Sequence, residues 1–182
     1  MNQKLLENNF VVVKDFISKD RANSFYEQFK EIHKKYSHEF VPHFIAGDAS
    51  SLYNPWIFSE LLIEKCVFMS EFLEEPVFPT YCIGRVYEKN GILKKHIDRP
   101  ACEISVTLHI NGDKNWPIWF TKPNKEIVSV ELDKGDAVIY LGMNSTHWRD
   151  EYKGNKYMQV FLHYVKARGE NRWAIFDKQK QQ

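Results

Sequence analysis

The sequence predicts a mainly β fold, an antiparallel sandwich or barrel with supporting N-terminal helices. Three observations lead to this prediction. Two helical apolar patterns occupy the first 79 residues, short strand-like apolar runs follow one another from Thr80 onward, and glycine-containing turn signals separate these runs. Seven or eight such strands at this spacing are typical of a sandwich or barrel. A chain of 182 residues can bury a full core, so we expect one domain over 1–182, with helical support at about 1–79, a β core at about 80–166 and a polar tail.

Composition excludes several classes of protein. The net charge of +1 gives no overall attraction to nucleic acid or membrane, and no stretch approaches the length of a membrane span. The beginning of the chain, MNQKLLENNF, lacks the apolar core of a signal peptide. Cys66, Cys82 and Cys102 include no C-x-x-C pair, which argues against a disulfide framework or a cysteine zinc site. We therefore expect a cytoplasmic protein with reduced thiols.

The N-terminal part predicts one strand and then one helix. Phe10 to Val13 is a short apolar, β-branched run, and Ser18 is a good helix N-cap. Apolar residues then recur at steps of three and four, as expected for one face of a helix. This stripe consists of Ala22, Phe25, Phe29, Ile32 and Tyr36.

A long loop and a second helix are predicted next. Glu39 to Ser51 contains Pro42 and a Gly47-Asp48 turn signal, so this segment is interpreted as a loop, and loops of this length often cover active sites. Asn54 followed by Pro55 predicts an N-cap and a first helical position, and helical spacing then continues to Leu73.

The sequence pattern of the remaining chain is typical of β-strands. The predicted strands are Tyr81 to Tyr87, Leu93 to Asp98, Ile104 to Ile110, Pro117 to Phe120, Ile127 to Leu132, Ala137 to Leu141 and Tyr157 to Val165. The turn signals are Asn90-Gly91, Asn111-Gly112, Lys134-Gly135-Asp136 and Lys153-Gly154-Asn155. Both helices are expected to pack against one sheet from outside.

The tripeptide His96-Ile97-Asp98 is the candidate metal-binding motif. Successive side chains of a strand point to opposite faces, so His96 and Asp98 emerge on the same face and can hold one ion together. An H-x-D tripeptide alone arises by chance in roughly one such chain in three, and its plain interpretation is a surface strand with two solvated residues. With His147 as third ligand the set becomes two histidines and one carboxylate, which leaves coordination positions open and suits iron(II).

At this point the sequence resembles the iron(II)- and 2-oxoglutarate-dependent dioxygenases, in their prolyl-hydroxylase-like branch. The resemblance covers Phe10 to about Val165 and rests on several motifs in order. Phe10 to Ser18 resembles the family's entry segment, and Arg85-Val86-Tyr87, Asn90-Gly91 and His96-Ile97-Asp98 resemble its tyrosine, glycine turn and metal-binding pair. Gly135 to Tyr140 and the later His147 resemble the strand that leads to the distal histidine. The family's fold, a double-stranded β-helix or jelly roll, is therefore expected.

The resemblance also implies ligands and roles. It implies Fe(II) held by His96, Asp98 and His147, with 2-oxoglutarate as cosubstrate, O₂ as reactant and ascorbate as a further cofactor. Lys156 falls where the family places the cation that anchors the far carboxylate of 2-oxoglutarate, although an exposed turn lysine would look the same. Arg149 is a competing anchor, because its planar guanidinium can hold a carboxylate with two hydrogen bonds.

Other polar positions follow from strand alternation and from the family pattern. If Ile104, Val106, Leu108 and Ile110 pack outward, then Ser105, Thr107 and His109 line the interior. His109 and Tyr87 resemble positions that contact the cosubstrate, although relatives often have a tyrosine where this chain has His109. His163 lies on the opposite parity from Lys156, Met158, Val160 and Leu162 and is therefore interpreted as structural.

The predicted activity is hydroxylation of an unactivated C–H bond, coupled to decarboxylation of 2-oxoglutarate. The branch that the sequence resembles makes a prolyl residue or another amino-acid side chain, in a peptide, a protein or an amino-acid-like molecule, the first substrate to test. One alternative is an oxygenase for a small molecule or a nucleobase, since the fold does not fix the substrate. The lack of a basic stripe makes nucleic acid a less favoured partner. The alternative from another class is a non-catalytic jelly-roll binding module.

Overall fold

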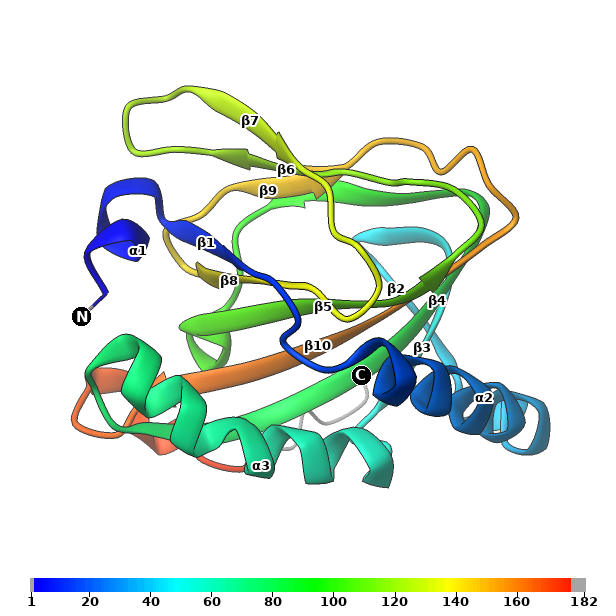
Figure 1. Cartoon of the computed structure of the whole chain (residues 1–182), viewed down its shortest axis with the longest axis horizontal. Coiled ribbons are helices and arrows are strands. Elements are labelled where there is room, and N and C mark those ends of the chain that lie inside the picture. The colour runs from blue at the N-terminus through cyan, green and yellow to red at the C-terminus, as the bar shows by residue number, and fades with distance from the viewer. Residues whose placement is uncertain (1, 178–182) are drawn as a thin grey trace.

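The computed structural model describes residues 2–177, and the polar tail predicted at Lys178 to Gln182 lies outside this range. Figure 1 shows two facing layers of strands, with the two long helices beneath one of them. Every strand pairing is antiparallel. The prediction of a mainly β fold with supporting N-terminal helices is confirmed.

The strands form one continuous hydrogen-bonded sheet that folds over itself into a barrel. The larger layer runs in the order β1 (Phe10–Val13), β8 (Ala137–Leu141), β5 (Ile104–Gly112), β10 (Lys156–Lys166), β4 (Val77–His96), β3 (Ala46–Tyr53) and β2 (Val41–His43). The smaller layer continues from the end of β4 through β9 (His147–Arg149), β6 (Ile118–Thr121) and β7 (Ile127–Val130). The strand β4 therefore belongs to both layers.

Two amphipathic helices cover the outer face of the larger layer. They are α2 (Lys19–Lys35), capped by the Ser18 side chain as predicted, and α3 (Trp56–Leu73). Their apolar faces share one core cluster with the outward side chains of β5 and β10. The short elements are α1 (Gln3–Asn8) and the 3₁₀ turns η1 (Ser37–Glu39), η2 (Pro100–Cys102) and η3 (Glu170–Ala174). Among the described residues, no helix combines the length and hydropathy needed to cross a bilayer.

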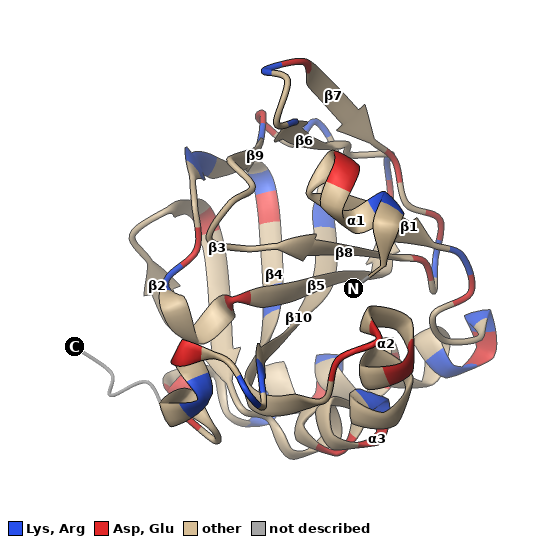
Figure 2. Ribbon diagram, turned by 90° about the vertical axis from the view of Figure 1, so that its left-hand side faces the viewer, with Lys and Arg blue, Asp and Glu red and all other residues tan. Residues whose placement is uncertain are grey.

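Strand alternation in β5 places polar side chains inside the barrel. Ile104, Val106, Leu108 and Ile110 pack against the helices, as predicted. Ser105, Thr107 and His109 point the other way, and all three are buried. The strands β5 and β8 contain no Lys, Arg, Asp or Glu and are tan in Figure 2, whereas β4 carries bands of both charges. The polar residues inside the barrel are consequently candidates for chemistry.

The segment Glu39 to Ser51 is not the loop that the sequence predicts. It contains the hairpin of β2 and β3, and β3 pairs with β4 from Ala46↔Leu93 to Tyr53↔Ile83. Residues 46–51 are small and polar and lack the apolar alternation of a strand, so only the tertiary pairing with β4 reveals them as one. This hairpin carries His43, Phe44 and Ile45 to the opening of the barrel.

The predicted turn at Asn90-Gly91 is also wrong, because β4 continues through it as one strand of 20 residues. Asn90 has the left-handed φ of 67° that a turn signal favours. The Asn90 N–H, however, donates to Tyr152 O, and the Tyr152 N–H donates to Gly91 O. These two hydrogen bonds keep the left-handed residue Asn90 within the sheet. The chain therefore bends at Asn90 and carries β4 from one layer to the other, without forming a turn.

The start of α3 differs from the prediction by one residue. Pro55 is the N-cap and Trp56 the first helical residue. The Asn54 side chain accepts a hydrogen bond from the Cys82 N–H at 3.0 Å instead of capping the helix. Asn54 therefore ties the beginning of α3 to β4.

Candidate active site

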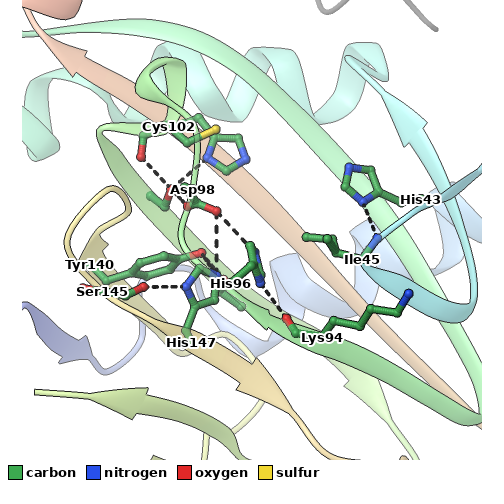
Figure 3. Close-up of polar contacts among 12 residues, drawn as sticks. His43, Ile45, Lys94, His96, Asp98, Cys102, Tyr140, Ser145 and His147 are labelled. Atoms are coloured by element: carbon green, nitrogen blue, oxygen red, sulfur yellow. Dashed lines mark hydrogen bonds and ion pairs between the residues drawn. The ribbon is translucent and has the colours of Figure 1, made fainter. Parts of the chain in front are cut away.

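The structure brings His96, Asp98 and His147 together. His96 ends β4, Asp98 follows it, and His147 begins the neighbouring strand β9, where it pairs directly with His96. One ligand atom of each residue lies within 4.8 Å of the others. Figure 3 shows the three side chains pointing toward one another.

Backbone carbonyl groups fix the orientation of both imidazoles. His96 Nδ1 lies 2.7 Å from Lys94 O, and His147 Nδ1 lies 2.9 Å from Ser145 O. A carbonyl oxygen only accepts, so each Nδ1 carries a proton and donates it. In the neutral rings each Nε2 then offers a lone pair, as in histidine ligands oriented by an outer partner.

Three electron pairs therefore converge on one point. Asp98 Oδ1 lies 3.5 Å from His96 Nε2 and 3.8 Å from His147 Nε2. Both distances exceed a hydrogen bond. Without a cation these three acceptors repel one another, and a divalent ion at their centre removes that repulsion. The donor set, two imidazole nitrogens and one carboxylate oxygen, fits iron(II) with positions left open.

Electrostatics prepare the same groups for a cation. Burial would raise the pKa of the Asp98 carboxyl, but the neighbouring imidazoles of His96, His147 and His163 outweigh it, so the pKa lies well below its usual value. Burial lowers the pKa of His147 to about 4, against the opposing effect of Asp98. At neutral pH the site therefore holds an ionised carboxylate and a neutral imidazole, the forms that bind metal.

A glycine next to the triad permits this close packing. The Asp98 N–H donates to Gly142 O at 3.0 Å, which places Asp98 against the turn after β8. A Cβ on Gly142 would lie 2.1 Å from Cys102 O and 2.6 Å from Asp98 Oδ2. Only glycine fits here without displacing the carboxylate.

Arg85 lines the same cavity as the triad, and the sequence analysis gave it no role. It is only 2% exposed, its Nε donates to Ser51 Oγ at 2.8 Å, and its Nη1 donates to Tyr87 Oη at 3.0 Å. Among the described residues no carboxylate pairs with it. A buried guanidinium with only neutral partners is a candidate site for an anion. The sequence did contain one signal for this position: Arg85 lies two residues before Tyr87 on the same predicted strand, so both side chains emerge on the same face.

Lys156 does not face the cavity. Its side chain is 64% exposed, and its Nζ lies 3.5 Å from Glu88 Oε1. It begins β10 on the outer parity, with Met158 and Val160, and borders a groove beside α2. The position of Lys156 thus contradicts its prediction as cosubstrate anchor. Counting nine residues from His147 could not show on which face the side chain emerges.

Arg149, the competing anchor, is buried inside the barrel. Its Nη2 donates to Gln159 Oε1 at 3.1 Å and its Nη1 donates to Trp116 O. Its guanidinium carbon lies 4.8 Å from the centre of the Trp116 ring and 5.1 Å from that of Tyr157. No carboxylate of the described chain pairs with Arg149 either. This end of the interior therefore holds two buried cations without an anion.

Tyr87 and His109 both lie in the interior. The Tyr87 hydroxyl accepts from Arg85 and lies 3.5 Å from Gln159 Nε2, so a polar chain joins the two arginines. His109 stacks on Tyr157 with ring centroids 4.6 Å apart, and burial together with the charge of Arg149 lowers its pKa to about 4. Neither His109 nor Tyr87 is in the lining of the metal cavity, so their predicted cosubstrate contacts remain predictions.

His163, which the parity argument assigned to the structural residues, lines the metal cavity. The prediction that His163 lies on the face opposite Met158, Val160 and Leu162 was correct, but the prediction of which face looks into the barrel was wrong. The face of Met158, Val160 and Leu162 packs on the helices, so the opposite face looks into the barrel.

At the mouth of the cavity, Phe44 is 81% exposed and Ile97 is 56% exposed, which gives the opening an apolar rim.

Comparison with known proteins gives one curated relative, and no protein-family profile matches the chain. A PKHD-type hydroxylase of Delftia acidovorans is 28% identical over 139 residues, which is 66% of this chain. The match spans 61% of that protein, so this chain covers about three fifths of its relative's length.

Solved structures agree closely in fold. A prolyl-4-hydroxylase of Pseudomonas putida superposes with a TM-score of 0.74, over 91% of this chain and 96% of its own, at 14% identity. A prolyl hydroxylase of Trichoplax adhaerens, in complex with a hypoxia-inducible-factor peptide, gives a TM-score of 0.73 at 13% identity, over 97% and 90%. HygX of Streptomyces hygroscopicus, with nickel and 2-oxoglutarate bound, gives 0.73 at 8% identity, over 92% and 88%. The predicted double-stranded β-helix is confirmed.

Proposed function

We propose that this protein is an Fe(II)- and 2-oxoglutarate-dependent oxygenase that hydroxylates an unactivated C–H bond. The observation that carries the proposal is one cavity in which three metal-binding lone pairs converge and an unpaired guanidinium, Arg85, lines the wall. A metal-free binding module needs neither feature. The hydroxylase relative and the oxygenase-like fold support the same conclusion.

In this proposal the chain's own residues hold and orient the reactants. His96, Asp98 and His147 would hold the metal ion, and a set of three protein ligands would leave coordination positions open for 2-oxoglutarate and O₂. The bound iron supplies the oxidising chemistry, driven by decarboxylation of 2-oxoglutarate. Ascorbate as a further cofactor remains a prediction.

The far carboxylate of 2-oxoglutarate is proposed to bind at the cationic end of the cavity. Arg85 faces the cavity, and Arg149 lies behind Gln159 and Tyr87. A carboxylate placed there forms charge-assisted hydrogen bonds and removes the cost of burying positive charge alone. Tyr87 accepts a hydrogen bond from Arg85 and thereby orients it.

Anaerobic titration of the metal-free protein with Fe(II) and 2-oxoglutarate tests the proposal. We expect 2-oxoglutarate to bind tightly only when Fe(II) is present, and metal binding to be lost in Asp98→Ala. Arg85→Met should weaken 2-oxoglutarate binding by a factor of about 30 or more, because a buried charged partner is removed.

Lys156→Met is the matched control, because it removes a cation of similar length from the outer face and should leave 2-oxoglutarate affinity unchanged. If Arg149→Met abolishes 2-oxoglutarate binding and Arg85→Met does not, the anchor is Arg149 and the activity stands. If 2-oxoglutarate binds equally well with and without iron, the oxygenase proposal fails.

The proposed substrate is a prolyl residue or another amino-acid side chain in a peptide, a protein or an amino-acid-like molecule. The apolar rim at Phe44 and Ile97 supports it, because a side chain inserted toward the metal would pass between apolar surfaces. Peptides, free amino acids, small molecules and nucleosides should be screened for stimulated succinate formation. Stimulation by nucleosides alone would contradict this substrate class.

We further propose that the described helices and barrel act as one domain in a reducing, cytoplasmic setting. The outer face of the sheet shares its core with α2 and α3, so neither part has a complete core alone. All three cysteines are free thiols.

A further inference from the structure

The two oxygens of Asp98 have different partners. Oδ1 faces the Nε2 atoms of His96 and His147, whereas Oδ2 accepts a hydrogen bond from Ser105 Oγ at 2.7 Å. Ser105 Oγ in turn lies 3.0 Å from His163 Nδ1. We infer that Ser105 and His163 are positioning residues that restrict Asp98 to one metal-binding oxygen. The inference rests on the proposed metal centre.

The direction of each hydrogen bond follows from the available protons. A carboxylate that binds a metal is deprotonated, so Asp98 Oδ2 can only accept. Ser105 has one hydroxyl proton and gives it to Asp98, at a shorter distance than the 3.3 Å to Cys102 O. Ser105 Oγ must therefore accept from His163, whose proton resides on Nδ1. The relay runs from His163 to Ser105 to Asp98.

Packing holds this relay rigid. Ser105 and His163 face each other as paired residues on β5 and β10, and they are 0% and 4% exposed. The His163 ring lies against Tyr81, with centroids 4.6 Å apart. Burial and these contacts restrict both side chains, so the proton that faces Oδ2 stays in place.

The consequence for the metal is a restricted coordination mode. If Oδ2 were free, the carboxylate could turn and chelate the ion with both oxygens. That turn would occupy a position that 2-oxoglutarate or O₂ needs in the proposed reaction. The relay keeps Oδ2 engaged and preserves the open positions.

The same neighbourhood offers a rival interpretation. Asp98, Cys102 and His163 form a second group of potential ligands within 4.8 Å. In the structure, however, Asp98 Oδ2 and His163 Nδ1 both contact Ser105, and Cys102 Sγ lies 2.9 Å from Tyr81 Oη. A second ion would have to break these contacts, so we favour the relay.

Cobalt(II) titration of the metal-free protein tests the relay without relying on turnover. Ser105→Ala should weaken Co(II) binding about tenfold, the low end of outer-sphere effects on metal sites. It should also change the visible Co(II) spectrum, because Asp98 can then chelate with both oxygens. Ser105→Thr retains the hydroxyl and should restore both affinity and spectrum. His163→Leu should act like Ser105→Ala, and His163→Asn, which keeps a donor near Nδ1, should recover part of the loss.

Ser70→Ala is the matched control, because it also removes a serine hydroxyl bond, from Ser70 Oγ to Cys66 O at 2.8 Å, but on α3, outside the barrel. It should leave Co(II) binding unchanged. The inference is overturned if folded Ser105→Ala and His163→Leu proteins bind Co(II) with wild-type affinity and spectrum. It is also overturned if the wild-type chain binds two Co(II) ions and Cys102→Ser removes one. A wild-type chain that binds no Co(II) defeats the proposed metal centre itself.

Discussion

Buried histidines dominate the behaviour of the metal-free chain at the residue scale. Burial lowers the pKa of His109, His147 and His163 to about 4 each, from an ordinary value of 6.5. At a pH between about 4 and 6.5, these imidazoles bind protons in the unfolded chain but not in the folded chain. Stability is therefore complete above pH 6.5 and is lost as the pH falls toward 4.

We predict that the metal-free protein is less stable at pH 5 than at pH 7.5, by about 1–2 kcal/mol for each such imidazole. Urea unfolding at the two pH values measures the difference. His109→Gln removes one of these groups at a distance from the metal ligands and should reduce the difference. Equal stability of the wild-type protein at both pH values would contradict the prediction.

Single residues also show what the sequence could and could not reveal. His96, Asp98 and His147 were predictable as neighbours, because alternation and a known motif order constrain them. Lys156 and His163 were assigned to the wrong sides of the barrel wall, since parity becomes informative only when the face that packs on the helices is known. Arg85 was overlooked because the absence of an anion around it is a property of the folded structure.

At the scale of elements, the contact between helices and sheet depends on a position in β4 that has no side chain, Gly84. A Cβ on Gly84 would lie 2.4 Å from Phe29 Cζ on α2 and 2.8 Å from Phe58 Cε2 on α3. Both rings are fully buried, so neither can move into solvent. The helices approach β4 closely because Gly84 has no side chain.

We expect Gly84→Ala to lower the free energy of unfolding by about 1–3 kcal/mol, the usual cost of overpacking a core. Chemical denaturation followed by circular dichroism gives the value. Gly47→Ala serves as control: its Cβ would meet only the Ile92 side chain, at 3.0 Å from Cγ1 and 3.5 Å from Cδ1. A Gly84→Ala protein as stable as the wild type would show that the helices shift at no cost.

Elements with a strong apolar period were predictable, and elements defined by their neighbours were not. The helices α2 and α3 and the strands β5, β8 and β10 follow their sequence patterns within one or two residues. The strands β2 and β3 lack apolar alternation and depend on pairing with β4. The sequence analysis interpreted the bend in β4 as a turn, because a left-handed Asn90 fits a turn and a bent strand equally well. Only the hydrogen bonds to Tyr152 in the folded chain distinguish the two.

At the scale of the whole molecule, the candidate metal site lies where the two layers join. His147 belongs to the smaller layer, whereas His96 ends the strand that both layers share. An ion bound there contacts the folded chain and finds no such site in the unfolded chain. Binding must therefore stabilise the entire fold.

We predict that Co(II) at 100 times its dissociation constant raises the free energy of unfolding by about 2.7 kcal/mol. Thermal unfolding with Co(II), and again after addition of excess chelator, measures the gain and its reversal. His147→Ala should show neither effect. Stabilisation of the His147→Ala protein to the same extent would place the ion elsewhere.

Because β4 belongs to both layers, it limits how this fold can diversify. Arg85 and His96 are positions on one uninterrupted strand, and each added or deleted residue between them would turn the later side chain to the opposite face. Length variation among descendants of this chain should therefore be rare between these two positions and common in the exposed turn that joins β6 and β7. Natural variation in the proposed substrate choice would then come from rims and hairpins, while the distance between the candidate metal site and the proposed anchor Arg85 stays constant.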